Sequence, residues 1–256
     1  MKLSLSANSF IDTNEPIDLS IPISSAENSV RAWYLNKPEI LPVRSNEFLG
    51  SIEEGGSVNF RNIFFNPHGH GTHTESCGHI TPKVYSVNSV LKVYFFKALL
   101  ISIEPELIRN EEYNTTDHVI TFDQVKKALS GKENIEALII RTLPNVKSKL
   151  ENNYSATNPP YFEYAIVDLL NQYCIKHFLT DLPSVDRELD GGALSFHHAF
   201  WNVPVNPNLE RTITELIYAD SNVEDGEYIL DLQLAPFEND ASPSRPILYK
   251  IKTVIE

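Results

Sequence analysis

Short runs of apolar residues recur along the chain, and their length suits buried strands better than helices. These runs lie at Val93–Phe96, Ala98–Ile103, Ala137–Ile140 and Ile229–Leu234. Because such runs present little polar surface, each predicted strand is expected to be covered on both of its faces.

Two further segments carry helical signals. Thr121 and Gln124 form a capping-box pattern that opens a short helix, Phe122–Leu129, which Gly131 closes. A second helix is predicted near Phe162–Lys176, after a pair of prolines. The apolar residues that keep helical spacing there are Ile166, Leu169, Leu170 and Tyr173. Since strands and helices mix without strict alternation, the pattern predicts an α/β or α+β domain.

The length and charge of the chain indicate how many domains it forms and which classes of partner it can bind. No clear linker or internal repeat divides the 256 residues, which favours a single domain over residues 1–256. Lys and Arg number 21 against 34 Asp and Glu, giving a net charge of −13. That balance argues against nucleic acid or an anionic membrane surface as a partner, because both attract clustered basic side chains.

The sequence also predicts where the protein resides. No segment approaches the ~18 consecutive apolar residues of a membrane span, and the first ten residues lack the apolar run of a signal peptide. The two cysteines, Cys77 and Cys174, form no CxxC pair, which favours a reducing compartment. These features together predict a cytoplasmic protein.

One glycine-punctuated stretch, NPHGHGTHTESCGHI at residues 66–80, holds half of the eight histidines. They are His68, His70, His73 and His79, with Glu75 among them. If residues 71–79 form an extended strand, His73, Glu75 and His79 share one face. Cys77 then lies between them on the same face, although a lone thiol in such a set is more often a packing residue than a ligand.

Two imidazoles and a carboxylate at this spacing can reach one or two divalent cations. Burying these groups unpaired would cost several kcal/mol, so we expect them to be solvated or joined by a cation. Zinc and manganese both suit a mixed set of His and carboxylate ligands. One strand supplies too few ligands for a closed site, and the pair His197 and His198 is a candidate for the remainder.

The same stretch resembles the signature HxGTHxDxPxH of the cyclase / bacterial kynurenine formamidase family of metal-dependent hydrolases. The GTH core at residues 71–73 and the final His79 match, whereas Glu75 replaces Asp and Cys77 replaces Pro. Further landmarks occur in the family's order, at Asp18–Ile23, Ala137–Thr142, Leu179–Asp186, Phe196–Trp201, Ile213–Ile217 and Asp240–Ile251. The resemblance implies a single α/β domain with a mixed central sheet of the swivelling β/α/β type.

The resemblance also implies roles for individual residues. The expected metal ligands are His68, His73, Glu75, His197 and Glu215, and the expected proton-transfer residue is His79. The family's first His falls at Gly69, which His68 and His70 flank, and a one-residue bulge would turn His68 inward. His197 is favoured over His198 because an apolar pair follows it at the family's spacing. Trp33 is expected to contact the substrate, although its surroundings, RAWYLN, lack the family's W-P-G pattern.

The activity implied is that of an arylformamidase-like amidohydrolase, which cleaves an amide or formamide bond of a small molecule through a metal-activated water. Two alternatives remain open, a hydrolase of a cyclic lactam or lactone and a binding protein without turnover. The resemblance further implies a homodimer or a higher homo-oligomer.

Overall fold

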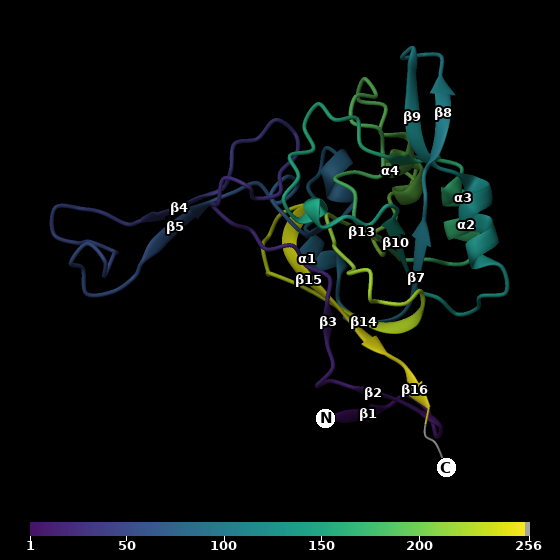
Figure 1. The fold of residues 1–256 in the computed structure, drawn as a ribbon, viewed down its shortest axis with the longest axis horizontal. Coiled ribbons are helices and arrows are strands. Elements are labelled where there is room, and N and C mark those ends of the chain that lie inside the picture. The colour runs from purple at the N-terminus through teal and green to yellow at the C-terminus, as the bar shows by residue number, and fades with distance from the viewer. Residues whose placement is uncertain (254–256) are drawn as a thin grey trace.

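The computed structural model describes residues 1–253, so residues 254–256 of the predicted domain lie outside the described residues. Its main element is an eight-stranded mixed sheet, in which the pairing of β14 with β15 closes a ring and β3 extends the free edge of β15 (Figure 1). Around the ring the order is β14 (Gly226–Leu234), β7 (Phe95–Ile103), β10 (Ala137–Thr142), β12 (His177–Thr180), β13 (Thr212–Glu215), β6 (His73–Glu75) and β15 (Ala241–Lys250). The added strand β3 is Ile17–Asp18. The predicted α/β class and mixed sheet are confirmed.

The parallel part of the sheet is formed by β7, β10, β12 and β13, and the remaining pairs in it are antiparallel. Every residue of β10 and of β12 is buried, as expected of strands covered on both faces. Because β12 and β13 run in the same direction, their carboxyl ends meet at one edge of the ring. That edge carries Glu215, the last residue of β13.

The strand predictions hold with one correction. The runs Val93–Phe96 and Ala98–Ile103 are not two strands, because β7 begins at Phe95 and continues through Lys97. Lys97 interrupts the apolar pattern but not the strand, since its amino group reaches the carboxylate of Glu227 on the neighbouring β14 at 3.0 Å. Ile229–Leu234 forms the second part of β14, as predicted.

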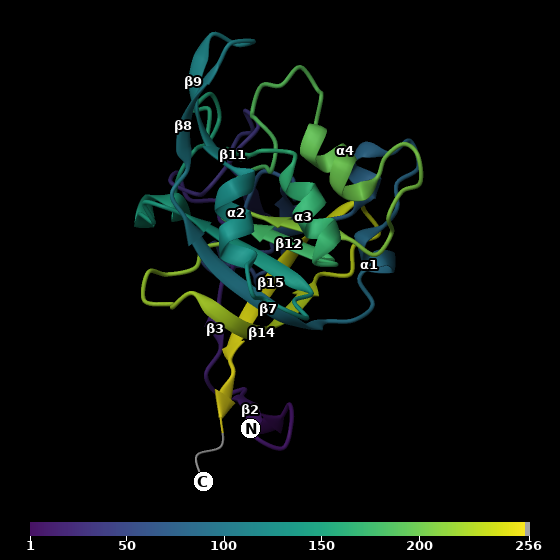
Figure 2. The same ribbon diagram turned by 90° about the vertical axis from the view of Figure 1, so that its right-hand side faces the viewer.

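Three helices pack next to one another on one side of the sheet (Figure 2). Helix α2 (Phe122–Leu129) has the predicted bounds, and the Gln124 side chain accepts a hydrogen bond from the backbone N–H of Thr121 at 3.0 Å. Helix α3 (Ile166–Gln172) is shorter than the predicted Phe162–Lys176. Its expected first turn is instead the short strand β11 (Tyr161–Phe162), which pairs with β9, so tertiary pairing overrides the local helical pattern. Helix α4 (Ser195–Trp201) follows a loop that contains Gly191 and Gly192.

Smaller elements lie around the ring. Strands β4 (Glu39–Pro42) and β5 (Arg61–Phe64) form an arm that projects far from the body of the molecule (Figure 1). The others are β1 (Lys2–Ser4), β2 (Ser9–Asp12), β8 (Glu106–Asn110), β9 (Thr115–Ile120), β16 (Lys252–Thr253), the 3-10 turns η1 (Cys77–Ile80) and η2 (Lys147–Leu150), and α1 (Val87–Val90). Within residues 1–253, every helix is too short or too polar to cross a membrane.

Candidate metal centre

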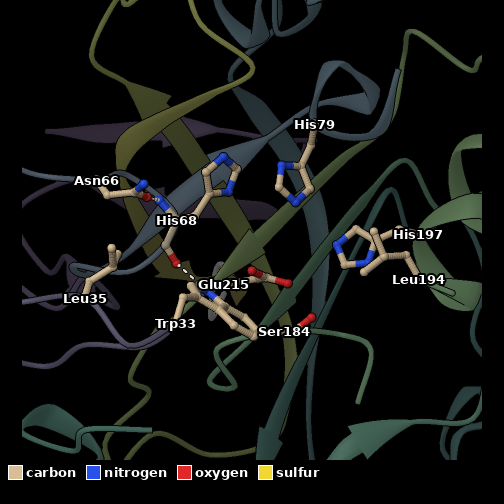
Figure 3. Close-up of a pocket in the computed structure, with 9 residues that line it drawn as sticks. All are labelled: Trp33, Leu35, Asn66, His68, His79, Ser184, Leu194, His197 and Glu215. Atoms are coloured by element: carbon tan, nitrogen blue, oxygen red, sulfur yellow. Dashed lines mark hydrogen bonds between the residues drawn. The ribbon is translucent and has the colours of Figure 1, made fainter. Parts of the chain in front are cut away.

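A cavity of about 340 Å³ opens where β6 and β13 lie side by side (Figure 3). Its lining residues come from distant parts of the chain and are Trp33, Leu35, Asn66, His68, His79, Ser184, Leu194, His197 and Glu215. Four of the residues predicted from the sequence to bind metal or transfer a proton therefore line one cavity. The other two, His73 and Glu75, lie in β6 with donor atoms close to those of His68.

The pairing of β6 with β13 places His73 directly opposite Glu215. Residues opposite one another on paired strands project to the same face of the sheet, and His73 Nε2 lies 3.4 Å from Glu215 Oε2. The other ring nitrogen, Nδ1, donates a hydrogen bond to the carbonyl of Gly71 at 3.0 Å. Nε2 of His73 is buried and has no hydrogen-bond partner among residues 1–253, so its lone pair is free to bind a cation.

Glu75 lies at the centre of the cluster with 1% of its surface exposed. Its Oε1 is 3.2 Å from His197 Nε2, and its Oε2 is 3.0 Å from His68 Nδ1 and 4.0 Å from His79 Nε2. Burial alone would raise the pKa of Glu75, but the surrounding imidazoles lower it well below its usual range. The carboxylate is therefore ionised, and it is within reach of three imidazoles at once.

His197 is held by a carboxylate that the sequence reasoning missed. Asp186 accepts hydrogen bonds from the backbone N–H groups of Phe196 and His197 at the start of α4, and from His197 Nδ1 at 2.6 Å. These bonds fix the ring so that Nε2 faces Glu75. His198 instead donates through Nδ1 to the carbonyl of Val203, so His197 is the member of the pair that reaches the cluster.

The local structure around His68 differs from the predicted bulge. Residues 67–69 form a turn outside the sheet, and the backbone N–H of His68 donates to the side chain of Asn66 at 2.9 Å. The chain then enters β6 through Gly71, whose φ of +136° is open to glycine and where a Cβ would lie 2.9 Å from the carbonyl of Ile21. This turn, rather than a bulge, carries His68 into the site.

His70 lies outside the cluster. Its Nδ1 accepts a hydrogen bond from the backbone N–H of Asn66 at 2.8 Å, and its Nε2 donates to the carbonyl of Asn36 at 2.7 Å. Both ring nitrogens are thus used by the backbone, which leaves neither for a metal. Of the two histidines that flank Gly69, His68 is the one in the cavity wall.

The strand predicted for residues 71–79 ends at Glu75, which corrects the expected placement of Cys77. Ser76 accepts a hydrogen bond from the backbone N–H of Gly78 at 3.2 Å and opens η1, so the alternation of faces stops there. Cys77 is completely buried in the core under the helices, where burial raises the pKa of its thiol. One turn of η1 still returns His79 to the side of Glu75.

Asp240, the residue immediately before β15, also belongs to the cluster and was not singled out by the sequence. Its Oδ2 lies 2.9 Å from His68 Nε2 and 3.3 Å from His79 Nδ1. The only sequence signal was its position as the first residue of the landmark Asp240–Ile251. The chain has 34 acidic residues, and nothing local distinguishes this one.

The donor atoms form three overlapping groups, each with its atoms within 4.8 Å of one another. The groups are His68, His73 and Glu75; Glu75, His79 and His197; and His68, His79 and Asp240. The buried Nδ1 of His68 also has no hydrogen-bond partner among residues 1–253, although it lies beside Glu75. Unpartnered imidazole nitrogens next to a buried carboxylate fit a divalent cation with mixed nitrogen and oxygen ligands.

Residues 17–187 of the chain match the family model described as "Putative cyclase". The chain belongs to this cyclase family. No curated protein matches the sequence. The resemblance seen in the sequence is thus confirmed at the level of the family.

Solved structures share the cyclase-family fold at low sequence identity. A potential metal-dependent hydrolase with cyclase activity is 16% identical, with 92% of this chain and 97% of that chain covered and a TM-score of 0.62. A predicted metal-dependent hydrolase from Bacillus stearothermophilus is 15% identical, with coverage of 92% and 98% and a TM-score of 0.59. An isatin hydrolase bound to the product analogue thioisatinate is 13% identical, with coverage of 93% and 93% and a TM-score of 0.64.

In this cyclase-family chain Trp33 forms part of the cavity wall (Figure 3). Its indole Nε1–H donates to the carbonyl of His68 at 3.3 Å, which ties the aromatic ring to the turn that carries the imidazole. The backbone of Trp33 has a φ of +62°, a left-handed conformation that is uncommon for a bulky residue. Strained backbone of this kind is concentrated at functional sites.

Proposed function

We propose that the chain is a metal-dependent hydrolase that cleaves an amide C–N bond of a small aryl compound. The observation that carries the proposal is the buried Glu75 carboxylate, which is surrounded by imidazole nitrogens. Two of the neighbouring histidines, His68 and His73, each have a ring nitrogen without a hydrogen-bond partner among residues 1–253. The names of the solved structures with this fold, which include metal-dependent hydrolases and an isatin hydrolase, support it.

Five residues would hold the metal, which we propose to be one or two ions of zinc or manganese. They are His68, His73, Glu75, His197 and Glu215. When bound, such a cation lowers the pKa of a coordinated water from 15.7 towards about 7 and polarises a carbonyl oxygen. The low pKa of Glu75 keeps its carboxylate charged for this purpose at neutral pH.

His79 is the proposed proton-transfer residue. It lines the cavity with about a third of its side chain exposed, and its Nε2 lies 4.0 Å from Glu75 Oε2. That position lets the imidazole take a proton from the attacking water and deliver it to the departing nitrogen of the substrate. The other ring nitrogen of His79, Nδ1, lies 3.3 Å from Asp240 Oδ2, so Nε2 is the nitrogen left for the substrate side.

The walls of the cavity support the proposed substrate class. Trp33, Leu35 and Leu194 provide apolar surface in the same cavity as the charged cluster, which suits a planar aryl group attached to a reactive amide. An aryl formamide and a ring amide fused to an aryl ring both fit this description. The ring amide is a second candidate because an isatin hydrolase with this fold has been solved with a product analogue.

Hydrolysis assays with an N-formyl arylamine and with isatin test the proposal. We expect at least one to be hydrolysed by the zinc- or manganese-loaded chain, with loss of activity on chelation and recovery on adding the metal back. Glu75→Gln should abolish turnover. Stoichiometric metal binding with hydrolysis of neither compound would contradict the proposed activity and favour binding without turnover.

A further inference from the structure

Asp240 is fixed between the strand and the 3-10 turn that carry the site. The next residue, Ala241, pairs with Glu75 across β15 and β6, and the carbonyl of Asp240 accepts a hydrogen bond from the backbone N–H of Ser76 at 3.0 Å. Its carboxylate therefore has a defined position beside the cluster. Only 17% of its side chain is exposed.

We propose that Asp240 is a positioning residue that holds His68 with Nδ1 towards the metal and His79 with Nε2 towards the substrate. This inference deepens the proposed function and rests on it for the role of His79. The part that concerns His68 rests on metal binding alone.

The proposed orientation of His68 follows from the tautomer that its contacts require. A carboxylate oxygen accepts, so His68 donates its Nε2–H to Asp240 at 2.9 Å, and Nδ1 is then the nitrogen with a free lone pair in the neutral ring. Nδ1 is also the buried, unpartnered atom that lies 3.0 Å from Glu75 Oε2. A metal-binding imidazole whose other nitrogen donates to a carboxylate is a common arrangement, and the carboxylate fixes both ring orientation and tautomer.

His68 then uses the opposite nitrogen from the two other imidazoles that face the cluster. Nδ1 of His73 donates to the carbonyl of Gly71, and Nδ1 of His197 donates to the carboxylate of Asp186. In both residues Nε2 is the nitrogen that faces the cluster. Nδ1 lies nearer the backbone than Nε2, so this choice changes the reach of the side chain. The use of Nδ1 explains how His68 can take the role of a metal ligand that the family signature assigns to position 69.

The same oxygen of Asp240 orients His79. The Nδ1–H of His79 donates to Asp240 Oδ2 at 3.3 Å, which leaves Nε2 as the free nitrogen on the cavity side. The rings of His68 and His79 lie 4.2 Å apart between centroids, so one carboxylate serves both.

The variant Asp240→Asn removes the charge and keeps the side-chain shape, and Glu238→Gln is a matched control on an exposed carboxylate two residues away. We measure Zn²⁺ affinity of the metal-free chain by chelator competition. Asp240→Asn should bind Zn²⁺ about 10–100-fold more weakly with the same stoichiometry, and Glu238→Gln should bind as the wild type does. Unchanged affinity overturns the proposal, and loss of a metal equivalent overturns it in favour of Asp240 as a direct ligand.

The tautomer of His68 can be determined in the wild type, so the proposal stays falsifiable if the Asp240 variant fails to fold. Nitrogen-15 NMR of the Zn²⁺-loaded wild type, with His68 assigned by His68→Gln, should show His68 protonated at Nε2. Protonation at Nδ1 contradicts the assignment.

Turnover separates this inference from the proposed function. Asp240→Asn should lower kcat and leave KM nearly unchanged, because His79 is misaligned while the apolar wall is intact. If the wild type hydrolyses neither aryl amide but the affinity and tautomer results hold, the activity is wrong and the positioning of His68 stands. If turnover occurs and neither affinity nor tautomer behaves as expected, the activity stands and the positioning role fails.

Discussion

Each imidazole at the metal centre has one ring nitrogen bonded to a fixed oxygen, and the carboxylates around the rings set their charge. Burial would lower the pKa of His68, but Asp240 and Glu75 raise it to about 10. Burial is likewise outweighed at His197, where Asp186 and Glu75 raise the pKa to about 10. At neutral pH the metal-free cluster therefore holds protons on the nitrogens that a cation would occupy.

Metal binding should consequently release protons. At pH 7 we expect about two protons to leave per cluster, one from His68 and one from His197, because each must expose a lone pair. The Zn²⁺ affinity should fall as the pH falls, since protons compete for the same nitrogens below their pKa. Calorimetric titration in buffers of different ionisation enthalpy measures the release, and a buffer-independent heat would contradict this account.

Replacement of His79 by Asn separates metal binding from proton transfer. The variant should keep its metal content, and its turnover should fall by roughly 10²–10⁴-fold, which is the usual contribution of a positioned acid–base group. The control is His118→Asn, at an exposed histidine on β9 that does not line the cavity. Unchanged turnover in His79→Asn would rule out the assigned role.

At the scale of elements, β6 and η1 form one unit that presents the central ligands. The strand places His73 and Glu75, and the turn returns His79 to the same place after a change of direction at Ser76. Gly78 is needed for this turn, because a Cβ there would lie 2.4 Å from the backbone oxygen of Tyr85. The position of His79 thus depends on the close approach of two backbone segments.

Gly78→Ala should therefore disturb both stability and activity. Forcing a methyl group against backbone typically costs about 1–3 kcal/mol, and the shift in η1 should lower kcat as well. Gly131→Ala, at the end of α2, adds a methyl group with no atom within 4 Å and should lower only stability, through its φ of +74°. Urea unfolding and turnover of both variants test the prediction, and normal turnover in Gly78→Ala would count against it.

These elements also show what the sequence could supply. Alternation predicted that His73 and Glu75 share a face, and the apolar runs predicted β10 and β14, because both are local properties of strands. The end of β6 could not be predicted, because the Ser76 cap competes with strand formation over only two residues. Asp186 and Asp240 could not be chosen either, since their partners lie more than ten residues away or in another part of the chain and many carboxylates look alike locally.

At the scale of the whole molecule, the closed sheet buries a histidine that is unrelated to the cluster. His177, on β12, packs against the ring of Phe96 at 4.0 Å between centroids, and its Nδ1 lies 2.8 Å from Thr212 Oγ1. Burial lowers the pKa of His177 from 6.5 to about 3. The unfolded chain therefore binds a proton between these two pH values that the folded chain excludes.

This difference makes unfolding easier in acid. The free energy of unfolding is unaffected by this group above pH 6.5. Between pH 6.5 and 3 it falls by about 1.4 kcal/mol per pH unit, because only the unfolded chain binds the proton. The free energy of unfolding of His177→Asn should accordingly fall less steeply from pH 6.5 to 5 than that of the wild type. Equal slopes in urea titrations would contradict the assignment.

The projecting arm bears on the expected homo-oligomer. A two-stranded sheet is at best marginally stable in water, and β4 and β5 expose Leu41, Ile63 and Phe64 by 49%, 56% and 59%. The chain enters and leaves the arm close to Leu35 and Asn66, which line the cavity. We expect a second copy of the chain to cover the arm, because exposed apolar surface of this kind marks protein interfaces.

Light scattering after size exclusion tests this expectation. The wild type should be a dimer or larger, and the double variant Ile63→Glu with Phe64→Glu should dissociate. Val84→Glu, at an equally exposed apolar residue outside the arm, should leave the assembly intact. A monomeric wild type would contradict the expected assembly.

The central claim is that segments from both halves of the chain bind one metal centre around Glu75. Anomalous diffraction from crystals grown with excess zinc or manganese tests it most directly. The account predicts one or two anomalous peaks beside Glu75, within coordination distance of His68 Nδ1, His73 Nε2, His197 Nε2 or Glu215. Ordered crystals in which these side chains point apart and no anomalous peak lies between them would contradict it.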